Sequence, residues 1–187
     1  MNTTNKVLAT ILIAQIVLVV VVFWPRAADY PDGDILFKGA EGNDITRLEI
    51  IDADNNRVLL ARSDDEWVMP EASDFVADSD KIDPILDNIK ALRTNRLATM
   101  TSDSHASLEV AEDKFQRRLK LTWADGEQKT LYLGSSGGAG ATHFRQAGKD
   151  EVYITGDITI WSAAAQASSY IDTLYFSVPR DTVTSLI

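Results

Sequence analysis

The stretch FQRRLKLTWADGEQKTLYL, residues 115–133, decides the fold. Its first half alternates large side chains with polar ones, and Leu119, Leu121 and Trp123 fall on the same face, as in a half-buried strand. An Asp–Gly dipeptide then supplies a turn typical of two-residue hairpins. The last six residues return to strand-forming composition, so the stretch predicts an antiparallel hairpin.

Three shorter segments upstream have the same strand character. Residues 45–51, 57–62 and 66–69 are separated by polar turns at 53–56 and 63–65. Tight polar turns between short strands are typical of an antiparallel meander.

The downstream part contains a loop, a hairpin and a helix by the same criteria. Residues 134–140 are rich in glycine and serine, which predicts a flexible loop. Residues 142–146 and 151–154 predict another hairpin. Residues 161–170 are rich in alanine and predict a helix, with Asp157 as a candidate N-cap.

Residues 80–92 form the clearest soluble helix, because apolar side chains recur on one face at three- and four-residue spacing. These apolar residues are Ile82, Ile85, Leu86, Ile89 and Leu92. The start of the helix stays open. Ser79 or Asp80 could cap it, or Asp83 could cap it with Pro84 at the first helical position.

The amino terminus has a different character, since 16 of the 18 residues from 7 to 24 are apolar. At about 1.5 Å per residue the run is about 27 Å long, enough for a bilayer core. We predict an uncleaved transmembrane helix with the amino terminus in the cytoplasm, because the run exceeds a signal peptide's apolar region and follows a short basic leader. The expected membrane-interface anchors are Lys6, Phe23, Trp24 and Arg26. Gln15 is either a tolerated lone amide or a hydrogen-bonding contact to a partner helix.

Together these patterns predict an α+β fold class: a single N-terminal transmembrane helix followed by an extracytoplasmic domain of antiparallel β-meanders with two or three helices. The expected domains are an anchor at 1–25, an acidic linker at 26–34 and the extracytoplasmic domain at 35–187. The expected location is the cytoplasmic membrane, with the last domain in the periplasm or outside the cell.

The composition excludes several function classes. The chain of 187 residues has no cysteine, and its 28 acidic against 18 basic residues give a net charge of −10. Thiol catalysis, disulfides and cysteine-bound zinc are excluded, and an acidic chain is a poor binder of nucleic-acid phosphates. The two histidines, His105 and His143, leave little material for a metal site. We therefore expect no enzyme activity, no cofactor, no metal and no nucleic-acid partner.

The motifs that could carry chemistry are incomplete. The glycine-rich residues 134–140 lack the Gly-Lys-Ser/Thr ending of a phosphate loop and precede a strand rather than a helix. Residues 52–56 begin like a calcium loop, but Arg57 stands at its sixth position and Ser63 at its twelfth, so we expect a solvated turn. Neither histidine has a recognisable catalytic partner in the sequence, which favours structural or surface roles.

Tryptophans and acids complete the candidates. Trp67, Trp123 and Trp161 are expected to be half buried and to pack in the core, with a partner-facing hot spot as the alternative. The acids are spread along the chain, so a solvated acidic surface is expected. A hydrolytic carboxylate pair stays open, because such pairs meet only in three dimensions.

Several short phrases, in their order and spacing, resemble a known bacterial family. They are EWVM at 66–69, ADSDKI at 77–82, LYLG at 131–134, THFR at 142–145, VY at 152–153 and SYIDT at 169–173. Over roughly residues 35–187 and the segment before them, the chain resembles the domain-of-unknown-function family 4340.

The resemblance implies one N-terminal anchoring helix, a domain outside the cytoplasmic membrane, frequent linkage to gliding-motility-type ABC transporters and no established catalytic residues. We therefore expect a non-enzymatic, membrane-anchored accessory or structural subunit of a membrane protein complex. Its expected partners are membrane protein subunits and the lipid bilayer. The resemblance implies an ABC-type transporter as the complex. The alternatives are another large energy-transducing membrane assembly and a stand-alone extracytoplasmic ligand-binding module.

Overall fold

The computed structural model describes four parts of the chain: residues 11–15, 18, 33–38 and 44–171. The chain divides into two compact units, Met1–Pro31 and Asp32–Ile187. Four predicted interface residues lie outside the described residues: Lys6, Phe23, Trp24 and Arg26. Gln15 is described, and it is helical with an exposed side chain.

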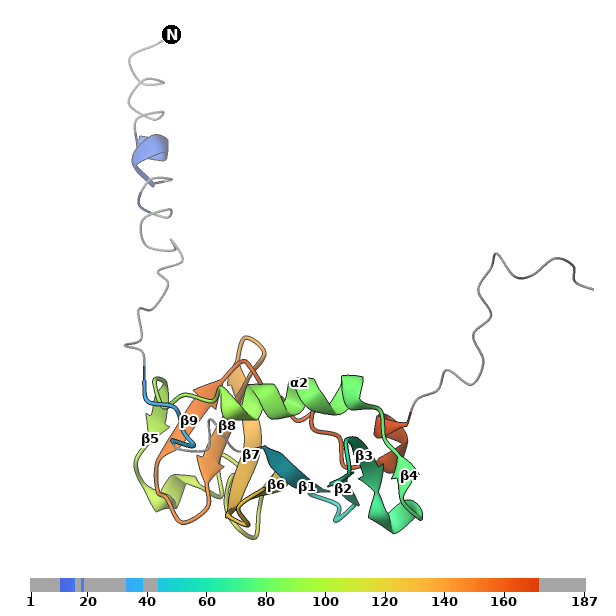
Figure 1. The fold of residues 1–187 in the computed structure, drawn as a ribbon. Coiled ribbons are helices and arrows are strands. Elements are labelled where there is room, and N and C mark those ends of the chain that lie inside the picture. The colour runs from blue at the N-terminus through green and yellow to red at the C-terminus, as the bar shows by residue number, and fades with distance from the viewer. Residues whose placement is uncertain (1–10, 16–17, 19–32, 39–43, 172–187) are drawn as a thin grey trace, which may run out of the picture. The chain divides into compact units, whose positions relative to one another are not determined.

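The second unit is built on one nine-stranded antiparallel sheet (Figure 1). Its strands are β1 (Ile45–Asp52), β2 (Arg57–Ser63), β3 (Glu66–Met69), β4 (Phe75–Val76), β5 (Leu97–Thr99), β6 (Arg117–Trp123), β7 (Gln128–Gly138), β8 (Ala141–Gln146) and β9 (Val152–Thr155). Across the sheet they follow the order β4-β3-β2-β1-β6-β7-β8-β9-β5. The short strands β4 and β5 are therefore its two edges.

The central pairing joins β1 to β6. The predicted strands at 45–51, 57–62 and 66–69 appear as β1, β2 and β3, and the Asp–Gly turn joins β6 to β7. In addition, β1 pairs with β6 and places Leu48 opposite Leu121. Both side chains are fully buried, so this pairing merges the two predicted meanders into a single sheet with a shared apolar face.

The helix α2 (Ser79–Lys90) lies across one face of this sheet (Figure 1). Its buried residues join the sheet's buried side chains in one core, and they are Ile82, Ile85, Leu86 and Ile89. The N-cap is Asp78, one residue before Ser79, the first predicted candidate. The Asp78 carboxylate accepts from the Asp80 amide at 3.1 Å. Pro84 lies inside the helix rather than at its first position.

The predicted fold class is wrong. The second unit is mainly antiparallel β, and its described residues contain one α-helix rather than two or three. The remaining helical elements are short 3-10 turns: η1 (Pro70–Ala72), η2 (Ser102–Ser104) and η3 (Ala167–Tyr170). Of the predicted transmembrane run, the structure describes only residues 11–15 and 18, and among all the described residues no helix is both long and apolar enough to cross a bilayer.

The predicted helix at 161–170 is also wrong, since only η3 in this segment is helical. Two side chains, Arg117 from β6 and Tyr170 from the end of the segment, bind carbonyls that a helix would use internally. The Arg117 Nε donates to the Ala163 carbonyl at 2.9 Å, and the buried Tyr170 hydroxyl donates to the Ala164 carbonyl at 2.8 Å. Tertiary hydrogen bonds therefore override the helical propensity of alanine.

The glycine-rich residues 134–140 do not form the predicted flexible loop. Strand β7 continues through them to Gly138, with register shifts after Leu133, and the turn to β8 comes at Ala139 and Gly140. Gly134 carries no Cβ where the backbone of residues 108–109 packs against the strand, so close packing explains this glycine better than flexibility does.

The turn after β1 is held by Asp52 rather than simply solvated. Its buried carboxylate accepts from the Asp54 amide, the Asn56 amide and the Asn56 side-chain amide, each at 2.9 Å. Burial raises the pKa of Asp52, but the hydrogen bonds from Asn56 and Asp54 and the charge of Arg117 outweigh it and leave the pKa below its ordinary value.

Substitution of Asp52 by asparagine is expected to lower the free energy of unfolding by about 1–2 kcal/mol at pH 7, since charge-assisted bonds are lost. A lowered folded-state pKa stabilises above the unfolded pKa, and this contribution disappears as pH falls through the folded value. The difference between wild type and Asp52→Asn in urea unfolding should therefore be full above about pH 5 and shrink below about pH 4. The exposed Asp54 provides the control, since Asp54→Asn keeps the bonds to the Asp52 carboxylate. A pH-independent difference for Asp52→Asn would contradict the assignment.

Candidate functional site

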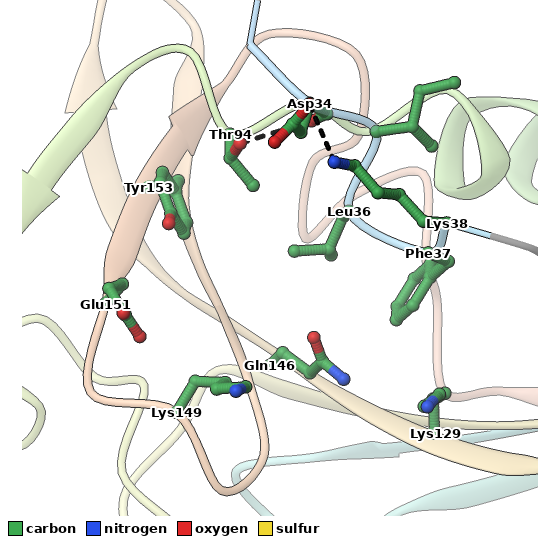
Figure 2. A pocket seen from close by; sticks show the side chains of 11 residues that line it. Asp34, Leu36, Phe37, Lys38, Thr94, Lys129, Gln146, Lys149, Glu151 and Tyr153 are labelled. Carbon is green, nitrogen blue, oxygen red and sulfur yellow. Dashed lines mark hydrogen bonds and ion pairs between the residues drawn. The ribbon is translucent and has the colours of Figure 1, made fainter.

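One hollow lies between the segment 34–38 and the strands β7 to β9. It has a volume of about 390 Å³, and Figure 2 shows the side chains around it. Leu36, Phe37 and Tyr153 supply its apolar part. The polar lining residues are Asp34, Lys38, Thr94, Lys129, Gln146, Lys149 and Glu151.

Two of the three lysines that line this hollow are ion-paired. The Lys38 ammonium lies 2.8 Å from the Asp34 carboxylate, and the Lys129 ammonium lies 2.6 Å from that of Glu127. Burial, with the Glu151 charge as a second cause, raises the pKa of Tyr153, so its hydroxyl stays protonated at neutral pH. The hollow can bind a small group that has both polar and apolar parts. Tyr153 cannot act there as a general base near neutral pH, because its hydroxyl is protonated.

A second hollow of about 320 Å³ lies beside α2, and Trp161 is one of the residues that line it. The helix contributes its face with Pro84, Ile85 and Asn88, and residues 161–170 contribute the other side. The Trp161 side chain is 82% exposed. This position contradicts the predicted core role of Trp161, whereas Trp67 and Trp123 are buried in the core as expected.

Other exposed apolar side chains lie at or next to the two edge strands. They are Phe75 and Val76 on β4, Leu97 on β5, and Met100 just after β5. The sequence patterns gave no signal for β4 or β5, because strands of two or three residues are too short to show a period.

The two histidines have structural roles, and each ring has its own hydrogen-bond partner. His105 is buried, and its Nε2 lies 2.9 Å from the Asp150 carbonyl. The Nδ1 of His143 lies 2.9 Å from the Ser135 carbonyl. Each ring therefore ties one loop or strand to another, which agrees with the structural role that the sequence favours.

The carboxylates of the described residues include neither a metal-binding group nor a recognisable general acid. Within residues 33–38 and 44–171, no group of three or more His, Cys, Asp or Glu side chains could hold a metal ion. Asp52 has a lowered pKa, which is opposite to the shift that a general acid needs at neutral pH. Its three donors show that it serves the turn.

Sequence reasoning did not find either hollow. The expected linker ends at Asp34, and the structure ties residues 34–38 to the segment after α2, where Ile35 bridges to Arg93 and the Leu36 amide donates to the Leu92 carbonyl at 2.8 Å. No local pattern reports such pairing. The local composition around Trp161 likewise gives no sign that its side chain is exposed.

Comparison with known proteins gives one match. A family model described as Domain of unknown function (DUF4340) matches residues 67–187, which is more than half of the chain. The matched range begins at β3, so it leaves out β1, the strand that joins β2 to β6. No curated protein matches the chain. No solved structure matches it either.

Proposed function

Because the chain belongs to the Domain of unknown function (DUF4340) family, whose description assigns no activity, we propose a function from the surface of the molecule. The domain is a non-enzymatic accessory or structural subunit of a membrane protein complex, and it acts through protein–protein contacts. The side chains that could take part in catalysis are used structurally, which supports this proposal. Both histidines and Asp52 are hydrogen-bonded to other parts of the fold.

The exposed Trp161 is the observation that carries the proposal. Tryptophan is the residue type most enriched at the energetic centres of protein interfaces. Here its side chain is 82% exposed beside a hollow whose other wall is the face of α2 with Pro84 and Asn88. An apolar ring next to a concave surface offers the kind of anchor and pocket that a partner subunit uses.

The proposed location is the cytoplasmic membrane, with residues 35–187 on its periplasmic or extracellular side. The support is the sequence, since the run from 7 to 24 is almost wholly apolar. The proposed complex is an ABC-type transporter, on the resemblance, and another large membrane assembly is the alternative. The chains that co-purify distinguish the two.

Substitution of Trp161 by alanine is expected to reduce recovery of the partner subunit by about tenfold or more, because truncation of an anchor costs about 2 kcal/mol. The measurement is quantitative co-purification from the native host in mild detergent, with tagged full-length chain and identification of each partner by mass spectrometry. Thermal unfolding of the variant should match that of wild type, because an exposed ring contributes little to the core.

The matched control is Met100→Ala, which removes a side chain that is 63% exposed on a different element. Partner recovery should be unchanged with this variant. Equal recovery with wild type and Trp161→Ala would contradict the proposed contact. A wild-type chain that purifies alone and monodisperse would contradict the accessory-subunit function itself.

A further inference from the structure

The guanidinium of Arg145 is a buried cation on strand β8. Its side chain is only 4% exposed. It nevertheless lines a hollow of about 390 Å³, together with Ser102 of η2 and the turn from β8 to β9, and this hollow shares only Lys149 with the one in Figure 2. A buried charge is costly unless another group compensates for it, so its partners decide what the hollow can bind.

Neutral groups hold Arg145 in place. Its Nε donates to the Val110 carbonyl at 2.7 Å, and its Nη1 donates to the Lys149 carbonyl at 3.0 Å. Its guanidinium carbon lies 4.8 Å from the centre of the Tyr132 ring, as in a cation–π contact. These contacts use two of the five N–H groups of an arginine and supply no full negative charge.

No ion pair found among the described residues includes Arg145. The titratable side chains around the hollow are His105, Glu112, Lys149 and Asp150. Glu112 and Asp150 are exposed, as is Lys149, and His105 is bonded through Nε2 to the Asp150 carbonyl. The charges of Glu112 and of Arg118, which lies over the Phe115 ring, both act on Tyr132, so its surroundings hold one negative and one further positive charge beside Arg145.

We propose that this hollow binds a monovalent carboxylate group, held by the free N–H groups of Arg145, and that Lys149, which lines both this hollow and the one in Figure 2, adds positive charge nearby. A planar guanidinium matches the two oxygens of a carboxylate, and a buried one gains most from the bond. Glu112 and Asp150 at the rim disfavour a dianion such as phosphate, because like charges repel in a partly buried site. The site therefore selects one negative charge.

The first test is a titration of the full-length chain with sodium acetate, followed by the Arg145 Nε–H signal in ¹H–¹⁵N spectra. Contact with the Tyr132 ring should separate this signal from those of exposed arginines. The expected result is a saturable shift with a dissociation constant of about 1–20 mM, as suits a ligand of four heavy atoms. Sodium chloride at equal ionic strength should not reproduce the shift.

Two variants test the charge argument without removing the arginine. Lys149→Ala keeps the backbone carbonyl that accepts from Arg145 and is expected to weaken acetate binding about threefold. Glu112→Gln removes a rim carboxylate and is expected to strengthen it about twofold to threefold. A Glu112→Gln variant that loses binding or thermal stability would overturn the proposal, since Glu112 would then be the internal counter-charge.

Further ligands identify the chemistry and its source. Phosphate that binds as tightly as acetate would overturn the selectivity for a monoanion, and an Arg145 signal unmoved by 100 mM acetate would overturn the site. Acetyl-Gly-Gly with a free carboxylate that binds more tightly than acetate would assign the site to a protein carboxyl group. Equal affinity would assign it to a small organic acid, and the amidated peptide should not bind in either case.

Discussion

Gly134→Ala is expected to lower the free energy of unfolding by about 3 kcal/mol or more, which corresponds to a fall of about 6–12 °C in Tm. A Cβ at this position would meet the Leu108 carbonyl oxygen, lie 2.9 Å from the Glu109 carbonyl oxygen and lie 2.6 Å from Cγ1 of Val110. Two of these three atoms belong to backbone, which cannot rotate away as a side chain can.

The opposing backbone is also tied to the strand. The Leu108 carbonyl accepts from the Ser135 amide at 2.9 Å, and the Val110 amide donates to the His105 carbonyl at 2.9 Å. Relief of the clash would therefore break hydrogen bonds in both segments, and each broken bond costs about 1 kcal/mol. The expected loss of stability therefore comes from overpacking by the added Cβ, and not from a change in the conformational freedom of the backbone.

Gly156→Ala is the matched control for this experiment. A Cβ at Gly156 would meet no atom within 4 Å, and its φ lies outside the positive region. We expect a change of about 0.5 kcal/mol or less in urea unfolding. If Gly134→Ala were as mild as Gly156→Ala, residues 108–110 would not pack on β7 as described.

The strand periods predicted most of the sheet because they reflect a local property. Alternation of side chains along β6 reports which face is buried, and a tight turn at residues 124–126 fixes the neighbour of that strand. The pairing of β1 with β6 joins segments about 70 residues apart, for example Ile50 with Leu119. No turn specifies that contact, so the sequence predicted two meanders and left their union unresolved.

Local composition failed where tertiary contacts overrule it. Alanine favours helix, but the carbonyls of Ala163 and Ala164 accept from Arg117 and Tyr170 instead. Glycine suggested a flexible loop at Gly134, whereas the structure needs the space that a Cβ would fill. Both errors arose from reading a residue's intrinsic preference without its distant neighbours.

The candidate sites were even less predictable. Trp161 belongs to a residue type common at interface hot spots, but no local pattern shows that its side chain is exposed. Arg145 was a polar residue in a predicted strand, and its burial over Tyr132 results from the register of β7 and β8. A sequence identifies residue types that could bind a partner or a ligand. Their burial in the folded protein decides which of them are candidates for a binding site.

Leu121→Ala is expected to lower the free energy of unfolding by about 3–4 kcal/mol, as for a leucine truncated in a packed core. The Leu121 side chain is 0% exposed on β6, opposite Leu48 of β1, so its removal leaves a cavity where the two halves of the sheet meet. Urea unfolding with circular dichroism measures the change.

Leu97→Ala removes the same atoms from the edge strand β5, where the side chain is 48% exposed, and should cost about 1 kcal/mol or less. The difference between the two variants isolates the effect of burial, because the chemistry of the substitution is identical. Both halves of the sheet depend on the β1–β6 pairing, so Leu121→Ala should keep a single cooperative transition at lower urea. Two separate transitions would instead mean that β1–β4 and β6–β9 fold independently, and the nine strands would then behave as two meanders rather than as one sheet.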